Sequence, residues 1–197
     1  MTPQDLWAAT GCRPDVAERC APHLRAAINK WNVRRVASFL AQTAHESRLF
    51  TRTIEDLNYT TPQRIREVWP SRFPKVEDAI PYVRDPRALA IRVYSNRRDL
   101  GNPPGDSGWV YRGRAWIMVT GLGNYTRYQQ ATGIEVINHP DLLEDPRYAA
   151  DAAGWFWSTR LLDSYDDARR VSRIVSGGET GLEERLALTR RALEVFP

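Results

Sequence analysis

The chain has 197 residues, 42% of them hydrophobic and 26% charged, with a formal net charge of +4. This length and hydrophobicity suffice for a buried core, which excludes an intrinsically disordered protein, and 2 cysteines are too few for a disulfide scaffold. The positive charge is almost all arginine, scattered along the chain with Asp or Glu nearby. We interpret it as an ordinary solvated surface, although a mild positive excess also favours polyanions.

The cysteines and the hydropathy pattern argue against a metal-binding, secreted or membrane-spanning protein. Cys12 and Cys20 flank a predicted helix, and no Cys/His cluster has zinc spacing, so we expect free structural thiols, no metal and no cofactor. The segment Met1–Leu6 lacks the basic and apolar runs of a signal peptide, and no stretch approaches the roughly 20 apolar residues of a membrane span. We therefore expect a cytoplasmically made monomer with no stable membrane association and no nucleic-acid partner.

Helix starts are marked by Asp or Thr followed by Pro, because the first residue caps free amides and proline fits the first helical position. These pairs are Thr2-Pro3, Thr61-Pro62, Asp85-Pro86 and Asp145-Pro146. Apolar spacing predicts further helices over about 33–48, 122–131, 164–175 and 181–195. The best strand candidate is Trp116–Val119. The sequence therefore predicts a mainly α fold, with at most a small β element, in one domain over residues 1–197.

Two stretches have no helical spacing, at residues 50–60 and 95–114. The second contains Asn102-Pro103-Pro104-Gly105-Asp106-Ser107-Gly108, which is strong turn chemistry. A loop this long inside a compact domain is often functional.

Glu46 is a candidate general acid near the end of the helix predicted over 33–48. It lies one helical turn from Gln42 and close to Thr43, so it borders the apolar face. A carboxyl held there is partly desolvated, which favours the neutral form that a general acid needs. The alternative is a surface glutamate near a helix end, and it remains open on these residues alone.

Two further acids, Glu55 and Asp56, follow the end of this helix. Glycosidases need a carboxylate pair, one to protonate the leaving oxygen and one to activate water or attack. Such pairs are also common in helical proteins without this chemistry. His45 is adjacent to Glu46 and therefore points in another direction, so we expect it to brace the structure rather than act as a base.

Residues 108–125 alternate aromatic, arginine and glycine residues before a predicted helix. Aromatic faces with polar edges suit sugar rings. An aromatic core strand that leads into a helix explains the same pattern. The segment lacks the lysine of a nucleotide-binding phosphate loop and the glycine pattern of a dinucleotide site.

Together these segments resemble the family 19 glycoside hydrolases, which include chitinases and, more closely, phage endolysins and related bacterial lysins. The ordered motifs are Phe39–Ser47, Glu55–Tyr59, Tyr111–Arg114, Thr120-Gly121 with Asn124-Tyr125, His139–Leu143, Ala152–Trp157, and Gly177-Gly178 with Gly181-Leu182 and Arg185. The resemblance implies a two-lobed, lysozyme-like or chitinase-like helical fold with a cleft, and an inverting mechanism on β-1,4-linked N-acetylated sugars.

The resemblance also implies roles for individual residues. Glu46 matches the general acid, Glu55 matches the general base with Asp56 as its rival, and Thr120 matches the residue that holds the attacking water. Expected substrate-binding residues are His45, Tyr59, Tyr111, Arg114, Asn124, Tyr125, Ser176 and Arg185. The chain departs from the family pattern at Ala115, Trp116, Met118 and Ser176, and the last two replace amides that could bind substrate.

Compact size, the missing secretion signal and the lysin-like segment Glu55–Tyr59 favour peptidoglycan over chitin as the substrate. We therefore expect a muramidase-like enzyme without a separate wall-binding module, held in the cytoplasm until it is released to the bacterial wall. Two alternatives stay open at this point. One is a chitinase that acts on N-acetylglucosamine polymers, and the other is a non-catalytic binder of glycan or nucleic acid.

Overall fold

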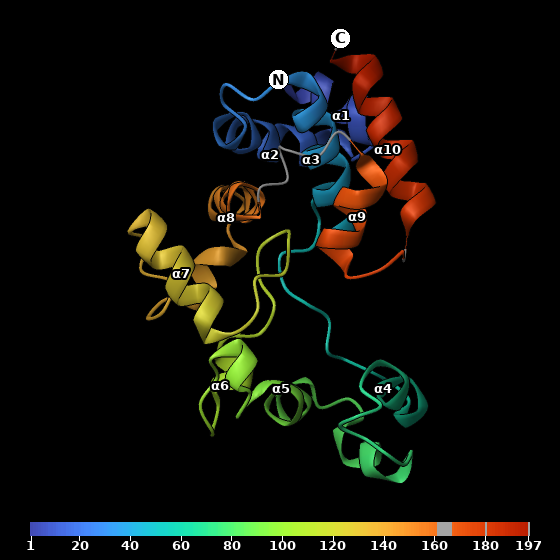
Figure 1. The fold of residues 1–197 in the computed structure, drawn as a ribbon, viewed down its shortest axis with the longest axis vertical. Helices are drawn as coiled ribbons and strands as arrows, with labels where there is room; N and C mark the ends of the chain where they lie inside the picture. Colours follow the sequence, from blue (N-terminus) through green and yellow to red (C-terminus); the bar gives the residue numbers. More distant parts are fainter. Residues whose placement is uncertain (161–166, 180, 197) are drawn as a thin grey trace. The chain divides into compact units, whose positions relative to one another are not determined.

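A computed structural model of the chain describes residues 1–160, 167–179 and 181–196. These residues are mainly α-helical and form no β-sheet, as the sequence predicts (Figure 1). The chain divides into two compact units. The first comprises Met1–Thr53, Ala115–Met118 and Leu142–Pro197, and the second comprises Ile54–Arg114 and Val119–Asp141.

The first unit is a helical bundle around α3. Its helices are α1 (Pro3–Thr10), α2 (Pro14–Ala27), α3 (Val33–Glu46), α8 (Pro146–Thr159), α9 (Ala168–Ser176) and α10 (Leu182–Val195). α10 packs along α3 and α1, and α2 packs against α8 (Figure 1). In the core, Phe39 meets Trp157 edge to face at 5.4 Å between ring centroids, and both side chains are fully buried. The contact stabilises α3, which ends at Glu46.

The second unit consists of short helices around a smaller apolar cluster. Its helices are α4 (Pro62–Val68), η1 (Glu77–Tyr82), α5 (Pro86–Tyr94), η2 (Arg98–Leu100), α6 (Ser107–Val110) and α7 (Leu122–Thr132), while η3 (Pro140–Glu144) crosses the boundary between the units. Ile65 of α4, Phe73, and Leu89 of α5 are buried together in its core. The loop predicted over 95–114 therefore contains two short helices, η2 and α6.

All four predicted Pro-containing helix starts are confirmed. Thr2, Thr61, Asp85 and Asp145 each accept a hydrogen bond from a backbone N–H in the first turn of the helix that follows. The helices expected over 33–48, 122–131 and 181–195 are α3, α7 and α10. α9 begins at Ala168, and the start expected at 164 lies outside the described residues.

The end of α3 and the expected strand differ from the prediction for the same reason, which is that non-glycine residues there adopt left-handed φ angles. α3 ends at Glu46 rather than at 48, and Arg48, Leu49 and Phe50 adopt left-handed φ angles of 50°, 58° and 63°. Ala115–Met118 form a turn instead of a strand, because Ala115 and Met118 have φ angles of 63° and 53°, which interrupt an extended strand. Of the predicted strand, Val119 pairs with Arg114 in an isolated bridge, and Arg114 also bridges Ile54.

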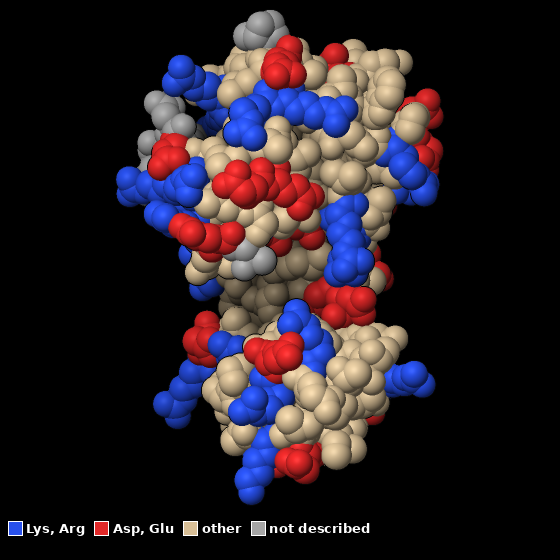
Figure 2. All heavy atoms as spheres, turned by 90° about the vertical axis from the view of Figure 1, so that its right-hand side faces the viewer, with Lys and Arg blue, Asp and Glu red and all other residues tan. Residues whose placement is uncertain are grey.

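Cys12 and Cys20 are buried and unpaired with each other, as predicted, and burial raises the pKa of both thiols. None of the described helices has the length and apolar character needed to cross a membrane. Figure 2 shows basic and acidic side chains intermixed on the face it presents. Several arginines pair with neighbouring acids, such as Arg87 with Asp106 and Arg173 with Glu179.

Candidate active site

Glu46 is the last residue of α3 and is held by a buried arginine from α10. Arg185 Nη2 donates to Glu46 Oε1 at 2.5 Å, and Nη1 donates to Gln42 Oε1 at 2.5 Å. The Arg185 side chain is 3% exposed, whereas Glu46 is 24% exposed. Among the described residues, nothing hydrogen-bonds to the second carboxylate oxygen of Glu46, Oε2. One oxygen is thus fixed by the protein, and the other is available to a ligand.

Gln42 extends this arrangement one helical turn back along α3. Its side chain is fully buried, and its Nε2 donates to Ser172 Oγ of α9 at 2.9 Å. Buried polar groups are costly unless they are hydrogen-bonded, and each partner here satisfies the next. The row Ser172–Gln42–Arg185–Glu46 therefore joins three helices and holds the carboxylate in place.

His45 packs against the backbone at the start of α10. A Cβ atom added to Gly181 would lie 2.3 Å from His45 Cε1, so the imidazole occupies the space where a side chain would stand. Nδ1 of His45 lies 3.0 Å from Glu184 Oε2, which is an ion pair only when the imidazole is protonated. These contacts link α3 to α10 within the first unit.

Glu55 is partly buried in the second unit, and both of its carboxylate oxygens accept hydrogen bonds. Oε1 accepts from the backbone N–H of Gly113 at 2.5 Å, and Oε2 accepts from the Tyr94 hydroxyl at 2.9 Å. Burial raises the pKa of Glu55, while the hydrogen bonds from Gly113 and Tyr94 and the charges of Arg112 and Arg114 oppose the rise. Burial and the carboxylate of Glu55 also raise the pKa of Tyr94, so its hydroxyl stays a donor.

Thr120 lies beside the same glycine. A Cβ atom on Gly113 would stand 3.2 Å from both Thr120 Oγ1 and Glu55 Cδ. Glycine therefore leaves room where the hydroxyl and the carboxylate approach each other. The first amide of α7 belongs to Leu122 and donates to Asn102 Oδ1 at 2.7 Å, so a distant side chain caps this end of the helix.

Asp56, the rival for the base, is arranged differently from Glu55. It is exposed, and its Oδ1 accepts from the backbone N–H of Asn58 at 3.0 Å, an interaction typical of a turn. In the second unit it is Glu55 that lies near Gly113 and Thr120.

Arg114 and Tyr125, expected to bind substrate, are buried and bonded within the second unit. Arg114 Nη1 donates to the carbonyl of Val110 at 2.6 Å and to the hydroxyl of Tyr125 at 3.1 Å. The Tyr125 hydroxyl donates to the carbonyl of Arg112 at 2.9 Å. Both side chains therefore hold the backbone around Gly113, and neither presents an exposed polar edge.

The remaining expected residues, Tyr59, Tyr111, Asn124 and Ser176, are partly buried. Tyr111 stacks edge to face on Tyr125 at 5.3 Å, and Tyr59 does so on Trp69 at 5.4 Å. Asn124 Nδ2 donates to the carbonyl of Thr120 at 2.6 Å. In the first unit, Ser176 Oγ donates to the carbonyls of Ser172 and Gly178, so its hydroxyl serves the end of α9.

Sequence reasoning missed Tyr94 and Gln42. Tyr94 is 39 residues from Glu55 along the chain, and no motif marks it. Gln42 stands one helical turn before Glu46, and this spacing was a usable signal. Among the described residues, no group of three or more His, Cys, Asp or Glu side chains could hold a metal ion.

No protein-family model matches the chain. A protein of Haemophilus influenzae described as "glycosyl hydrolase family 19 domain-containing" is 34% identical over 159 residues, which cover 81% of this chain and 78% of that protein. Endochitinase 1 of Theobroma cacao and endochitinase A2 of Pisum sativum are 30% and 29% identical over 128 residues. Those matches cover 64% of this chain but only 33% and 32% of the plant proteins.

An identity of 34% over most of this chain and of the Haemophilus influenzae protein places this chain among the glycoside hydrolases. The chain belongs to glycoside hydrolase family 19.

Proposed function

We propose that the protein is an enzyme that hydrolyses β-1,4 bonds in the glycan of peptidoglycan by an inverting general acid/base mechanism. The observation that carries the proposal is the pair of glutamates held in different ways. Glu46 keeps one oxygen on Arg185 and leaves the other open, while Glu55 is partly buried and accepts hydrogen bonds from Gly113 and Tyr94. Glycosidases of this kind assign opposite proton-transfer tasks to two carboxyl groups.

In this mechanism Glu46 is the general acid. Its Oε2 carries the proton that passes to the glycosidic oxygen as the bond to the anomeric carbon breaks. Arg185 keeps Oε1 in place and stabilises the carboxylate left after the transfer. Arg185 is thus a positioning residue for the acid, since it contacts Glu46 and is itself buried.

Glu55 is the general base. It removes a proton from a water molecule that attacks the anomeric carbon on the opposite face, which inverts the configuration. A base is most effective when its pKa lies near the working pH, and burial moves the pKa of Glu55 upward in that direction. Thr120, whose hydroxyl lies beside Gly113, hydrogen-bonds the same water.

Three features favour peptidoglycan over chitin. The relative that matches most of its own length is bacterial, whereas the plant endochitinases match over about a third of theirs. The segment Glu55–Tyr59 resembles the lysin branch of the family. The net charge of +4 also suits an anionic wall. The proposal includes action at the wall as a monomer, with glycan strands rather than nucleic acid as the polymer bound.

The substrate is tested by comparing initial rates on purified peptidoglycan and on chitin oligomers at equal enzyme concentration. The proposal expects release of reducing ends from peptidoglycan at a rate that exceeds the chitin rate by tenfold or more. A higher rate on chitin would favour the chitinase alternative. Binding without release of reducing ends from either polymer would favour a non-catalytic relative.

A further inference from the structure

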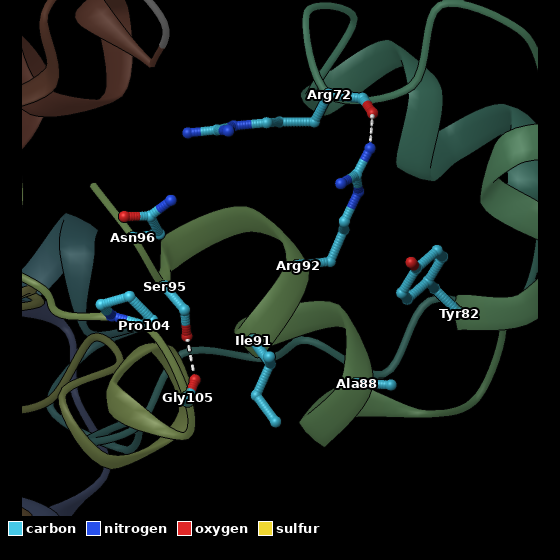
Figure 3. Close-up of a pocket in the computed structure, with 9 residues that line it drawn as sticks. All are labelled: Arg72, Tyr82, Ala88, Ile91, Arg92, Ser95, Asn96, Pro104 and Gly105. Carbon is cyan, nitrogen blue, oxygen red and sulfur yellow. Dashed lines mark hydrogen bonds between the residues drawn. The ribbon is translucent and has the colours of Figure 1, made fainter.

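A pocket of about 550 Å³ opens in the second unit, on residues to which the proposed mechanism gives no role (Figure 3). It is bounded by α5, by the residues that follow α5, and by two loops. The lining residues are Arg72, Tyr82, Ala88, Ile91, Arg92, Ser95, Asn96, Pro104 and Gly105. Pockets of this size bind small molecules and short polymer segments.

The charge of the pocket is carried by two arginines. Arg92 Nη2 donates to the backbone carbonyl of Arg72 at 3.2 Å, which holds the Arg92 guanidinium beside the backbone of Arg72. Figure 3 shows the Arg72 side chain extending away from this hydrogen bond, in the direction of Asn96. No acidic residue lines the pocket, and neither guanidinium forms an ion pair with the described residues. Arginine is a fork of donors that matches a carboxylate or a phosphate.

The pocket lining also has an apolar part, here called the apolar wall. It presents the side chains of Ile91 and Ala88 and the rings of Tyr82 and Pro104. Ser95 Oγ donates to the carbonyl of Gly105 at 2.7 Å and accepts from the N–H of Gly108 at 2.9 Å, which holds the loop against α5. A ligand that fits this wall has methyl or methylene groups next to its anionic group.

We propose that this pocket binds the carboxylate end of a short acidic peptide with small aliphatic side chains. A polyol phosphate would satisfy the arginines but leave the apolar wall without a partner, so the peptide is the better fit. In the substrate proposed above, such a peptide is the stem peptide attached to the glycan. The inference rests on the proposed function, and it makes the pocket a second contact that tells peptide-bearing glycan from bare chitin.

The test uses the whole protein and a synthetic tetrapeptide, Ala-Glu-Lys-Ala, with a D-glutamate and a free C-terminal carboxylate, measured by isothermal titration calorimetry. Arg72→Gln and Arg92→Gln are each expected to weaken binding by about tenfold or more, because each removes a charged hydrogen-bond donor. Arg87→Gln is the matched control, since Arg87 lies on the same helix but pairs with Asp106. It should bind the peptide like the wild type.

A tetrapeptide whose carboxylates are amidated should bind at least tenfold more weakly to the wild type. Arg72→Gln should also raise KM on peptidoglycan and leave the rate on peptide-free glycan oligomers unchanged. Equal peptide affinity for the wild type and Arg72→Gln would overturn the inference. So would tighter binding of inorganic phosphate or of a glycerol phosphate polymer than of the peptide, which would assign the arginines to a phosphate ligand.

Peptide affinity and glycan hydrolysis are separate measurements, so failures of the two proposals are distinguishable. Peptide binding at Arg72 without hydrolysis of peptidoglycan would contradict the proposed function alone. Hydrolysis of peptidoglycan without peptide binding would contradict the pocket alone.

Discussion

The Tyr94 hydroxyl donates a 2.9 Å hydrogen bond to Oε2 of Glu55, although 39 residues separate them along the chain. Glu55 is partly buried, and this desolvation disfavours its charged form and raises its pKa. The hydrogen bond from Tyr94 favours the charged form, so it moderates the effect of burial. Tyr94 is therefore a positioning residue that adjusts the strength of the proposed base.

Tyr94→Phe should raise the pKa of Glu55, because the variant deletes a donor to the carboxylate and keeps the ring. The base would then be protonated up to a higher pH, so the acidic limb of the plot of kcat against pH should move to higher pH. Tyr148→Phe, on α8 in the first unit, is the control and should leave the profile unchanged. A Tyr94→Phe profile that coincides with the wild type would show that Tyr94 does not act on the base.

The roles of the two glutamates can be separated by the leaving group. On an aryl glycoside that needs little protonation, Glu46→Gln should recover most of the loss of about 10²–10⁴-fold expected on the natural bond, because only the acid step becomes dispensable. Glu55→Ala should stay impaired on the aryl substrate but regain activity with azide, a nucleophile that needs no base. Recovery of Glu55→Ala on the aryl glycoside without azide would exchange the two roles.

Variants of Thr120 and Asn102 distinguish a loss of catalysis, expected at Thr120, from a loss of stability, expected at Asn102. Asn102 Oδ1 accepts from the first amide of α7 and its Nδ2 donates to the carbonyl of Tyr94, so Asn102→Ala removes both bonds and should lower the free energy of unfolding by about 1–3 kcal/mol. Thr120→Val should leave the melting temperature nearly unchanged and lower kcat at least tenfold, about 1.4 kcal/mol of barrier. Thr120→Ser should retain most activity. A less stable Thr120→Val with full activity per folded molecule would remove Thr120 from the mechanism.

Alanine variants of Gly181 and Gly177 distinguish the energetic cost of a left-handed φ angle from the cost of a clash with His45. Both have left-handed φ angles, 69° and 72°, but a Cβ atom meets His45 Cε1 at 2.3 Å only at Gly181, whereas nothing lies within 4 Å at Gly177. Gly177→Ala should cost about 1 kcal/mol of unfolding free energy for the φ angle alone. Gly181→Ala should cost clearly more.

The excess cost at Gly181 should shrink when His45→Ala is combined with Gly181→Ala, because the atoms in conflict are then absent. Chemical denaturation of the four variants and the wild type gives these differences. Equal costs for Gly177→Ala and Gly181→Ala would mean that His45 moves aside without penalty.

The parts of the fold that the sequence predicts correctly are local. Each Pro-containing helix start is correct because the capping residue and its amide lie within the first turn. The end of α3 and the turn at 115–118 were missed because Arg48, Ala115 and Met118 adopt left-handed φ angles that non-glycine residues rarely show. These angles depend on packing and are not visible in residue type.

For the candidate site, short sequence motifs suggested Glu46, Glu55 and Thr120, but not the side chains that hydrogen-bond to the two carboxylates. Arg185 is 139 residues from Glu46, and only the family resemblance pointed to it. The burial of Arg114 was not anticipated either, because an arginine in an aromatic and glycine-rich segment is equally compatible with an exposed edge and with a buried role.

The most direct test of the central claim is mass spectrometry of the soluble fragments released from purified peptidoglycan by the wild type and by Glu46→Gln. The Gln side chain still accepts from Arg185 but cannot donate a carboxylic proton, and Glu194→Gln, exposed on α10, is the control. The wild type and the control should release glycan fragments with new reducing ends, first seen by NMR as the inverted α anomer, and Glu46→Gln should release at least about 100-fold less. Fragments cut only in the peptide, or equal release by Glu46→Gln, would contradict a glycosidase that uses Glu46 as its acid.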